Sequence, residues 1–212
     1  MFGSSASLPG LFGLRLLRQA LALAVLAITF CLLATLPSHA IDARSLLPIR
    51  AAADAPSGAA ALCDRYDWAC AGSKTQRSLP KNAMDVIRAV NLRANRSIHP
   101  LSDAAQYARE ENWSLPTRNG GDCEDYALFK KYELIKAGIP AERLLIATVL
   151  DKRNRAHAVL VVRTGKTDLV LDNMTNRILN WEKTGYTFLR MQDPASPDRW
   201  VALLAGGVLA RI

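Results

Sequence analysis

The sequence predicts an α+β fold in which N-terminal helices pack on an antiparallel sheet. Up to Gly138 the chain contains several segments with helical character, one of which begins at Cys123. After Pro140 it contains short apolar runs separated by turn residues, the pattern of consecutive strands. Helices followed by strands are typical of the α+β class.

The start of the chain predicts export. Two arginines precede an apolar run over 20–36, and small residues over 37–40 form a site that a signal peptidase would read. We therefore expect residues 1–40 to be a signal peptide, cleaved after Ala40, and the mature protein to reside in the periplasm. Cys31 lies in this signal peptide and would be removed with it. The apolar run is long for a signal peptide, so an uncleaved N-terminal membrane anchor is the alternative.

The mature chain is long enough for one domain, since 212 minus 40 leaves 172 residues. An Ala, Pro and Ser-rich stretch over 41–58 is predicted to be a flexible lead-in, and residues 59–212 to be the domain. The formal charge of +8 falls to +6 without the two arginines of the signal peptide, which favours anionic partners such as a membrane surface or an acidic substrate. The basic residues are scattered, so no nucleic-acid binding is predicted. We expect a monomer.

Helical segments are predicted at about 59–71, at 84–94, at about 102–112 and from Cys123 onward. Strands are predicted over 144–150, 156–163, about 166–173, 186–190 and 200–204, with a turn over 151–155. The apolar close of the chain, 208–210, is far below spanning length and is expected to be core or a short tail.

Cys123 is predicted to lie in the first turn of its helix. Two glycines before Asp122 permit a tight turn, Asp122 is a good N-cap residue, and the helix is expected to end at Gly138. Asp125 stands at N3, so the two aspartates could form a reciprocal capping box. The helix dipole and an adjacent imidazolium would lower the pKa of the Cys123 thiol. The alternative is a small buried cysteine on a well-capped helix.

Two residues of the predicted strands complete a set with this cysteine. If only Thr164 and Gly165 separate the second and third strands, partner numbers sum to 329 and His157 lies directly opposite Asp172. A one-residue slip would place them on opposite faces, and Asp172 would then simply begin a turn.

Cys123, His157 and Asp172 are the residue types that thiol-based acyl transfer needs. Cys123 would be the nucleophile, His157 the base that takes its proton and later returns it to the leaving group, and Asp172 the group that orients the imidazole. One oxyanion donor is expected to be the backbone N–H of Cys123. Gln106 and Trp113 are candidates for the second.

Motifs over a large part of the chain resemble a known family. They are Val90-Asn91, Ile98-His99-Pro100-Leu101-Ser102-Asp103, Trp113, Gly121-Asp122-Cys123-Glu124-Asp125-Tyr126, Gly138-Ile139-Pro140, His157-Ala158-Val159-Leu160, Leu171-Asp172-Asn173 and Trp181. With them the chain resembles the bacterial transglutaminase-like cysteine peptidases, a family that includes periplasmic adhesin-releasing proteases of the LapG type. The resemblance runs from about Ala60 to Leu203.

This resemblance implies a papain-like or transglutaminase-like core and a Cys-His-Asp triad on Cys123, His157 and Asp172. It also implies proteolysis of a secreted or surface protein. The partners that it implies are a protein substrate such as a surface adhesin and an inner-membrane regulatory receptor.

The resemblance further implies a calcium site on the acids that flank the nucleophile, Asp122 and Glu124. Calcium takes six to eight oxygens, so backbone carbonyls, water or another carboxylate such as Asp125 would have to complete it. The alternative is that these acids only suit the first turn of a helix. The chemistry itself requires no cofactor. No second Cys or His stands near Cys123 at the spacing of a zinc site.

Cys63 and Cys70 are the other cysteines of the mature chain, and in an oxidising compartment they are expected to form a disulfide. A continuous helix would hold their Cα atoms about 10 Å apart, beyond the reach of a bridge. The chain must therefore bend within 64–69, where related sequences commonly carry a proline and this one does not.

Three classes of function remain open at this point. A cysteine endopeptidase is the reading that the family resemblance favours. A transglutaminase-type acyl transferase would use the same acyl-enzyme and offer it an amine instead of water. A binding module could keep the fold without catalysis, although a complete triad argues against it.

Overall fold

The computed structural model describes residues 45–211. The signal peptide predicted over 1–40, its alternative as an anchor, and Cys31 lie outside these residues. Among the helices that are described, none is both long and apolar enough to cross a membrane.

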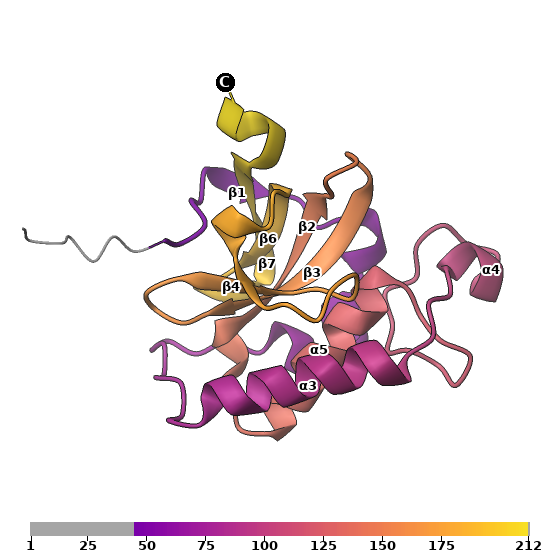
Figure 1. The fold of residues 1–212 in the computed structure, drawn as a ribbon, viewed down its shortest axis with the longest axis horizontal. Helices are drawn as coiled ribbons and strands as arrows, with labels where there is room; N and C mark the ends of the chain where they lie inside the picture. The colour runs from indigo at the N-terminus through magenta and orange to yellow at the C-terminus, as the bar shows by residue number, and fades with distance from the viewer. Residues whose placement is uncertain (1–44, 212) are drawn as a thin grey trace, which may run out of the picture. The chain divides into compact units, whose positions relative to one another are not determined.

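The core of the fold is one antiparallel sheet with the strand order β1-β7-β6-β2-β3-β4-β5 (Figure 1). The strands are β1 (Ala51–Ala53), β2 (Leu144–Leu150), β3 (Ala156–Arg163), β4 (Asp168–Leu171), β5 (Leu179–Asn180), β6 (Thr187–Asp193) and β7 (Ser196–Gly206). Every pair of neighbouring strands is antiparallel. The α+β class is therefore confirmed.

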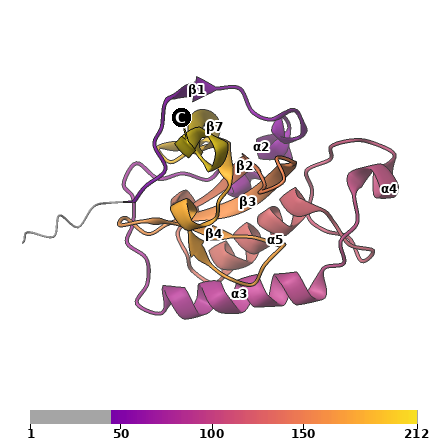
Figure 2. The same ribbon diagram turned by 45° about the horizontal axis from the view of Figure 1, so that its top comes forward.

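The helices are α2 (Leu62–Arg65), α3 (Ala83–Ser97), α4 (Asp103–Tyr107) and α5 (Cys123–Lys136), with short 3-10 helices η1 (Ser57–Ala59), η2 (Asp67–Cys70), η3 (Ala141–Arg143), η4 (Trp181–Lys183) and η5 (Gly207–Arg211). Helices α5 and α3 cover one face of the sheet, whereas Trp181 of η4 packs against the apolar cluster on the opposite face. Helix α5 packs on β3 and β2, and α3 packs on the outer side of α5 (Figure 2). Strands β3 and β2 thus support α5, whose first residue is Cys123.

The central strands β2 and β3 are mostly apolar, and both of their faces are buried. In β2, Leu144 and Ile146 belong to the cluster under the helices, whereas Leu145 and Ala147 belong to a second cluster on the opposite face. This alternation follows the two-residue period of a strand. It explains why β2 and β3 have the bounds expected from their apolar runs.

The helical predictions are confirmed in type but differ in length. Helix α3 extends the predicted 84–94 segment, whereas α4 is much shorter than 102–112. Ala108 adopts a left-handed conformation with φ 52°, which ends α4. The C-terminal strands β6 and β7 are longer than the runs over 186–190 and 200–204, because they continue to a tight hairpin.

The expected disulfide between Cys63 and Cys70 is present, with the two Cα atoms 5.5 Å apart. The bend that it requires lies at Tyr66, where an extended conformation separates α2 from η2. The predicted helical segment over 59–71 is therefore broken. The bend forms without a proline, and the side chain of Asp67 accepts from the backbone N–H of Trp68 just after it.

The segment expected to be a flexible lead-in, 41–58, lies against the sheet from Ser45 onward. Leu47 is buried, and its N–H donates to Asp168 Oδ2 over 2.8 Å. Further along, β1 pairs with β7. This difference arises because distant strands supply partners for its backbone, which the local composition does not reveal.

The predicted register of the β3–β4 hairpin is wrong by two residues. Arg163 pairs with Asp168, so partner numbers sum to 331 (163 plus 168). The side-chain oxygen of Thr164 accepts from the N–H groups two and three residues further on, and Arg163 makes two hydrogen bonds to Asp168. These contacts stabilise a longer loop than the two residues assumed. Because the shift is even, it leaves every side chain on its predicted face.

Candidate active site

Two glycines place Cys123 at the beginning of α5. Gly120 has a φ of +136°, and a Cβ there would lie 2.1 Å from the carbonyl oxygen of His99. A Cβ on Gly121 would lie 2.5 Å from Asp125 Oδ2. The loop can therefore approach both neighbours only with glycine at these positions, as the tight turn predicted from the sequence requires.

The capping box expected between Asp122 and Asp125 is absent from the described structure. Asp122 is the N-cap residue by position, but its Oδ2 accepts from the N–H of Asp103 over 3.1 Å. Asp125 Oδ1 accepts from the N–H of Ser114 over 3.0 Å, and burial raises the pKa of Asp125 to about 7. Both carboxylates bind loop segments outside the helix, so they hold the approach to Cys123 in place.

Asp103, Asp122 and Glu124 form an acidic cluster beside Cys123. One carboxylate oxygen from each lies within 4.8 Å of those of the others. Asp103 Oδ1 and Asp122 Oδ1 are buried, and neither has a hydrogen-bond partner among the described residues. Burial and the nearby Asp122 raise the pKa of both Asp103 and Glu124. Three close carboxylates with unpartnered oxygens suit a hard cation.

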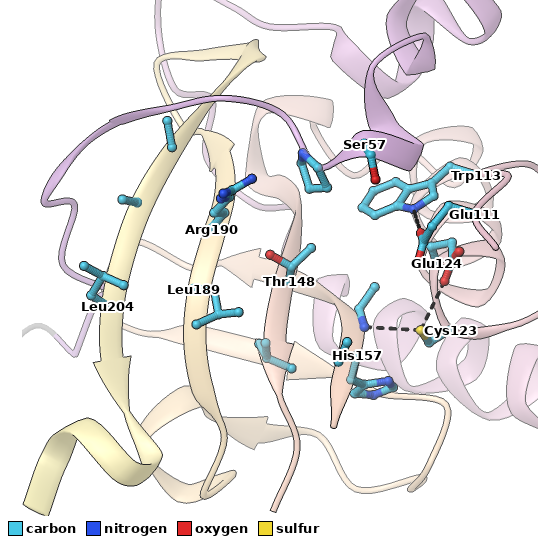
Figure 3. Close-up of a pocket in the computed structure, with 16 residues that line it drawn as sticks. Ser57, Glu111, Trp113, Cys123, Glu124, Thr148, His157, Leu189, Arg190 and Leu204 are labelled. Atoms are coloured by element: carbon cyan, nitrogen blue, oxygen red, sulfur yellow. Dashed lines mark hydrogen bonds between the residues drawn. The ribbon is translucent and has the colours of Figure 1, made fainter. Parts of the chain in front are cut away.

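The sulfur of Cys123 contacts this cluster on one side and β3 on the other. Its thiol donates to Glu124 Oε2 over 3.1 Å, and the N–H of Ala158 donates to Sγ over 3.3 Å (Figure 3). Burial and the negative charge of Glu124 raise the pKa of the Cys123 thiol. The direction is opposite to the lowering expected from the helix dipole, because burial first, and the acids beside the sulfur second, disfavour the thiolate.

His157 and Asp172 are joined by a buried hydrogen bond of 2.9 Å between His157 Nε2 and Asp172 Oδ1. They are not direct partners in the ladder, since β4 ends at Leu171 and Asp172 follows it. The side chains of Asp172 and His157 nevertheless meet as predicted. We refer to them below as the His157–Asp172 pair.

Two further groups donate to the Asp172 carboxylate, and a third donates to its backbone carbonyl. Oδ1 also accepts from the N–H of Met174 over 2.9 Å, and Oδ2 accepts from the hydroxyl of Tyr186 over 2.5 Å. The backbone carbonyl of Asp172 accepts from the side-chain amide of Asn95. Burial alone would raise the pKa of Asp172, but the hydrogen bonds from His157 and Tyr186 outweigh it and hold that pKa below its usual range.

Cys123 and His157 line the same cleft, which has a volume of about 610 Å³. Figure 3 shows Cys123, Glu124 and Trp113 on one wall, with Leu189, Arg190 and Leu204 on the strands opposite. This volume lies within the range of pockets that bind a whole small ligand, about 300–1,000 Å³. Asp172 lies behind His157, outside the cleft lining.

Of the two candidates for a second oxyanion donor, only Trp113 lines this cleft. Its indole N–H donates to Glu111 Oε2 over 2.9 Å. The side-chain oxygen of Gln106 instead accepts from the hydroxyl of Thr117.

Sequence reasoning missed Asp103 and Tyr186 as members of the site. Asp103 was only part of a family motif and of a predicted helix, and Tyr186 was only part of a predicted strand. No local spacing connects either residue with Cys123 or Asp172. The fold alone brings them together.

Comparison with known families identifies the class. The family described as "Bacterial transglutaminase-like cysteine proteinase BTLCP" matches residues 49–207, which is most of the chain. The chain therefore belongs to this family of cysteine proteinases, as its motifs indicated. No curated protein sequence matches it significantly.

Solved structures of Legionella pneumophila LapG are similar to parts of the chain. The calcium-bound form has 23% identity and a TM-score of 0.49, and the match covers 58% of this chain and 71% of that one. The EGTA-treated form has 25% identity and a TM-score of 0.47, with 52% and 63% covered. A third LapG structure has 22% identity and a TM-score of 0.44, with 52% and 65% covered.

Proposed function

We propose that the protein is an exported cysteine endopeptidase that cleaves a periplasmic or surface protein through an acyl-enzyme. The observation that carries this proposal is one cleft lined by Cys123 and His157, with Asp172 hydrogen-bonded behind His157. Membership of a cysteine proteinase family supports the reaction class. The signal peptide expected over 1–40 supports the location.

The histidine nitrogens have different roles in this mechanism. Asp172 accepts a hydrogen bond from the N–H at Nε2 of His157. The other nitrogen, Nδ1, therefore carries the lone pair that can take the proton of the Cys123 thiol. The tautomer is thereby fixed, and Asp172 stabilises the imidazolium that forms. The sulfur must leave Glu124 for this transfer, and the N–H of Ala158 then stabilises the thiolate.

Peptide cleavage follows in two stages. Sγ attacks the scissile carbonyl carbon, and the oxygen that becomes negative is stabilised by the free backbone N–H of Cys123 at the start of α5. The imidazolium returns its proton to the leaving amine, which departs and leaves a thioester. His157 then takes a proton from water, whose oxygen attacks the thioester and releases the acid and the thiol.

We further propose calcium as the ion of the acidic cluster. Asp103, Asp122 and Glu124 would hold it, with backbone carbonyls and water completing its six to eight oxygens. The two unpartnered buried oxygens of Asp103 and Asp122 support this assignment. A bound calcium would offset the negative charge beside Cys123. Asp125, considered from the sequence as a further ligand, lies outside this group of three; its Oδ1 accepts from the N–H of Ser114, and its Oδ2 is buried without a partner among the described residues.

The decisive experiment compares the exported and surface proteins of cells that carry the wild-type protein with those of cells that carry Cys123→Ala. We expect a new protein N-terminus that appears only with wild type. A new isopeptide cross-link in place of a cleaved chain would indicate the transferase. Identical protein sets in the two strains would contradict catalysis and favour a binding module.

A further inference from the structure

Tyr186 contacts both members of the His157–Asp172 pair. It immediately precedes β6 and is buried, with 7% of its surface exposed. Its hydroxyl donates to Asp172 Oδ2 over 2.5 Å. Its ring meets the His157 imidazole edge to face, with centroids 5.9 Å apart and planes at 87°. One side chain therefore constrains the rotamer of Asp172 and the plane of His157.

Among the described residues, only the Tyr186 hydroxyl donates to Asp172 Oδ2. Asp172 is 3% exposed, and its Oδ1 is occupied by His157 and Met174. Burial and the adjacent Asp172 raise the pKa of Tyr186, so its hydroxyl stays protonated and remains a donor. Without this donor a carboxylate oxygen would be buried and unpaired.

Tyr186 is itself held by groups that do not belong to the pair. Its N–H donates to Thr184 Oγ1 over 3.1 Å, and that hydroxyl donates to the carbonyl of Trp181 over 2.7 Å. Gly185 has a φ of +73°, which turns the chain from η4 into β6. The ring also packs in the apolar cluster on the face of the sheet away from the helices. These contacts hold Tyr186 in position independently of its hydrogen bond to Asp172.

Tyr186 and Asp172 also line a cavity that contains charged side chains. A small cavity of about 40 Å³ is lined by both residues together with the two basic residues Lys152 and Arg177. The other charged groups near the pair are Asp151, which bears electrostatically on Tyr186, and Lys130 of α5, which bears on Asp172. Loss of the ring would enlarge the cavity that the carboxylate already lines, and Asp172 would have fewer packing contacts to hold its side chain in place.

We propose that Tyr186 is a positioning residue that acts through Asp172 to hold His157 in the tautomer and orientation needed to take the Cys123 proton. The proposal rests on the peptidase function above. Tyr186 does not touch the reacting atoms, so its whole effect is transmitted by the carboxylate and the imidazole.

The first test is Tyr186→Phe, which removes the hydroxyl and keeps the ring. With a peptide that spans the cleavage site found in the exported proteins, we expect kcat to fall about tenfold and KM to stay within about twofold. Tyr66→Phe is the matched control, because the Tyr66 hydroxyl also makes a hydrogen bond, which it accepts from the N–H of Leu115, and Tyr66 does not line the cleft. Unchanged kcat in Tyr186→Phe would overturn the proposal.

A double-mutant cycle separates positioning from a merely structural role. If Tyr186 acts through Asp172, then Tyr186→Phe should have no further effect on kcat in an Asp172→Asn background. Two effects that multiply would show that Tyr186 acts independently of the carboxylate. If Tyr186→Phe fails to fold, 3,5-difluorotyrosine at position 186 keeps the shape and changes only the strength of the donor, and kcat should still change.

Nitrogen-15 NMR of His157 tests the inference without a substrate. At neutral imidazole we expect a single Nε2–H tautomer in wild type and a mixture of tautomers in Tyr186→Phe. Identical tautomer populations would overturn the positioning role. If wild type cleaves no peptide at all, the proposed function fails, whereas the NMR result still decides whether Tyr186 orients His157.

Discussion

The acidic cluster and the His157–Asp172 pair lie on either side of Cys123, and they differ in how completely their hydrogen bonds are made. Around Asp172, both carboxylate oxygens have donors from the chain itself. In the acidic cluster, Asp103 and Asp122 each retain a buried oxygen without a partner among the described residues. The first group is completed by protein donors, and the second is not.

This difference shows in the direction of the carboxyl pKa values. Donors from His157 and Tyr186 hold the pKa of Asp172 below its usual range although it is buried. Burial and like charge raise the pKa of Asp103 and Glu124. Equal burial therefore has opposite consequences, depending on whether positive or donor groups face the carboxylate. It follows that the pair can be preorganised by folding alone, whereas the acidic cluster is suited to an added cation.

The largest expected effect, a loss of kcat, comes from a substitution in the His157–Asp172 pair. Asp172→Asn should leave the fold intact and reduce kcat by about two to four orders of magnitude, because the amide can no longer hold the Nε2–H tautomer as a carboxylate does. Steady-state kinetics on the peptide, with circular dichroism as the fold control, measure it. Equal turnover in the two proteins would leave Asp172 as a turn residue that binds the N–H of Met174.

A smaller effect, on the melting temperature, is expected when calcium is removed from the acidic cluster. Addition of EGTA to the calcium-loaded protein should lower its melting temperature by about 5–10 °C, since a ligand at a hundred times its Kd contributes about 2.7 kcal/mol. Glu124→Gln should weaken calcium binding and reduce this response. Calorimetry with and without EGTA measures both, and elemental analysis counts the calcium.

Asp85→Asn provides the control for the cluster variant. Asp85 is an acid of α3 whose ion pair with Arg88 is exposed, so its loss should leave the EGTA response unchanged. A wild-type protein that contains no calcium and does not respond to EGTA would reduce Asp122 and Glu124 to acids of a helix terminus.

The same contrast occurs on a smaller scale in two adjacent buried lysines of α5. Lys131 Nζ donates to Gln192 Oε1 over 2.7 Å, whereas Lys130 Nζ has no hydrogen-bond partner within the described residues and lies 5.9 Å from the ring of Tyr126. Burial lowers the pKa of each lysine to about 7. At pH 6 both are charged, so Lys130→Met and Lys131→Met should each stabilise the protein, Lys130→Met more because it removes no hydrogen bond.

The pH dependence of this gain follows from the lowered pKa values. Below pH 7 the lysines are charged in both the folded and the unfolded chain, and the full cost of burying the charge, a few kcal/mol, is present. Between pH 7 and about 10.5 the folded protein has lost protons that the unfolded chain retains, so this cost declines. The advantage of both methionine variants in melting temperature should therefore fade by about pH 10. A constant advantage from pH 6 to 10 would contradict the lowered pKa values.

The strands of the central sheet were predictable because their signal is local. An apolar run over 144–150 and another over 156–163 specify strands whose two faces are buried, and the structure gives those bounds. The register of the next hairpin was not predictable, because it depends on how the side chains of Thr164 and Arg163 bind the loop. The predicted register was wrong by an even number of residues, so each side chain was still assigned to the correct face of the sheet.

The site was predictable where one segment determines it and unpredictable where the fold combines segments. The helix that begins at Cys123 is specified by neighbouring glycines and acids. The capping box failed because Asp103 and Ser114, distant in sequence, offer better donors to those acids. The raised pKa of the Cys123 thiol was not predicted, because the dipole of α5 could be inferred from the sequence, whereas burial of the sulfur depends on the whole fold.

The bend at Tyr66 also affects which cysteines form a disulfide as the chain folds. In the proposed periplasmic location, Cys63, Cys70 and Cys123 would be oxidised as the chain folds, and each could pair with either of the others. The native pair is separated by only 7 residues, and closing a loop costs about 0.6 kcal/mol more for each doubling of its length. Local pairing is therefore favoured over capture of Cys123, and the short bridge protects the nucleophile from being consumed before the cleft exists.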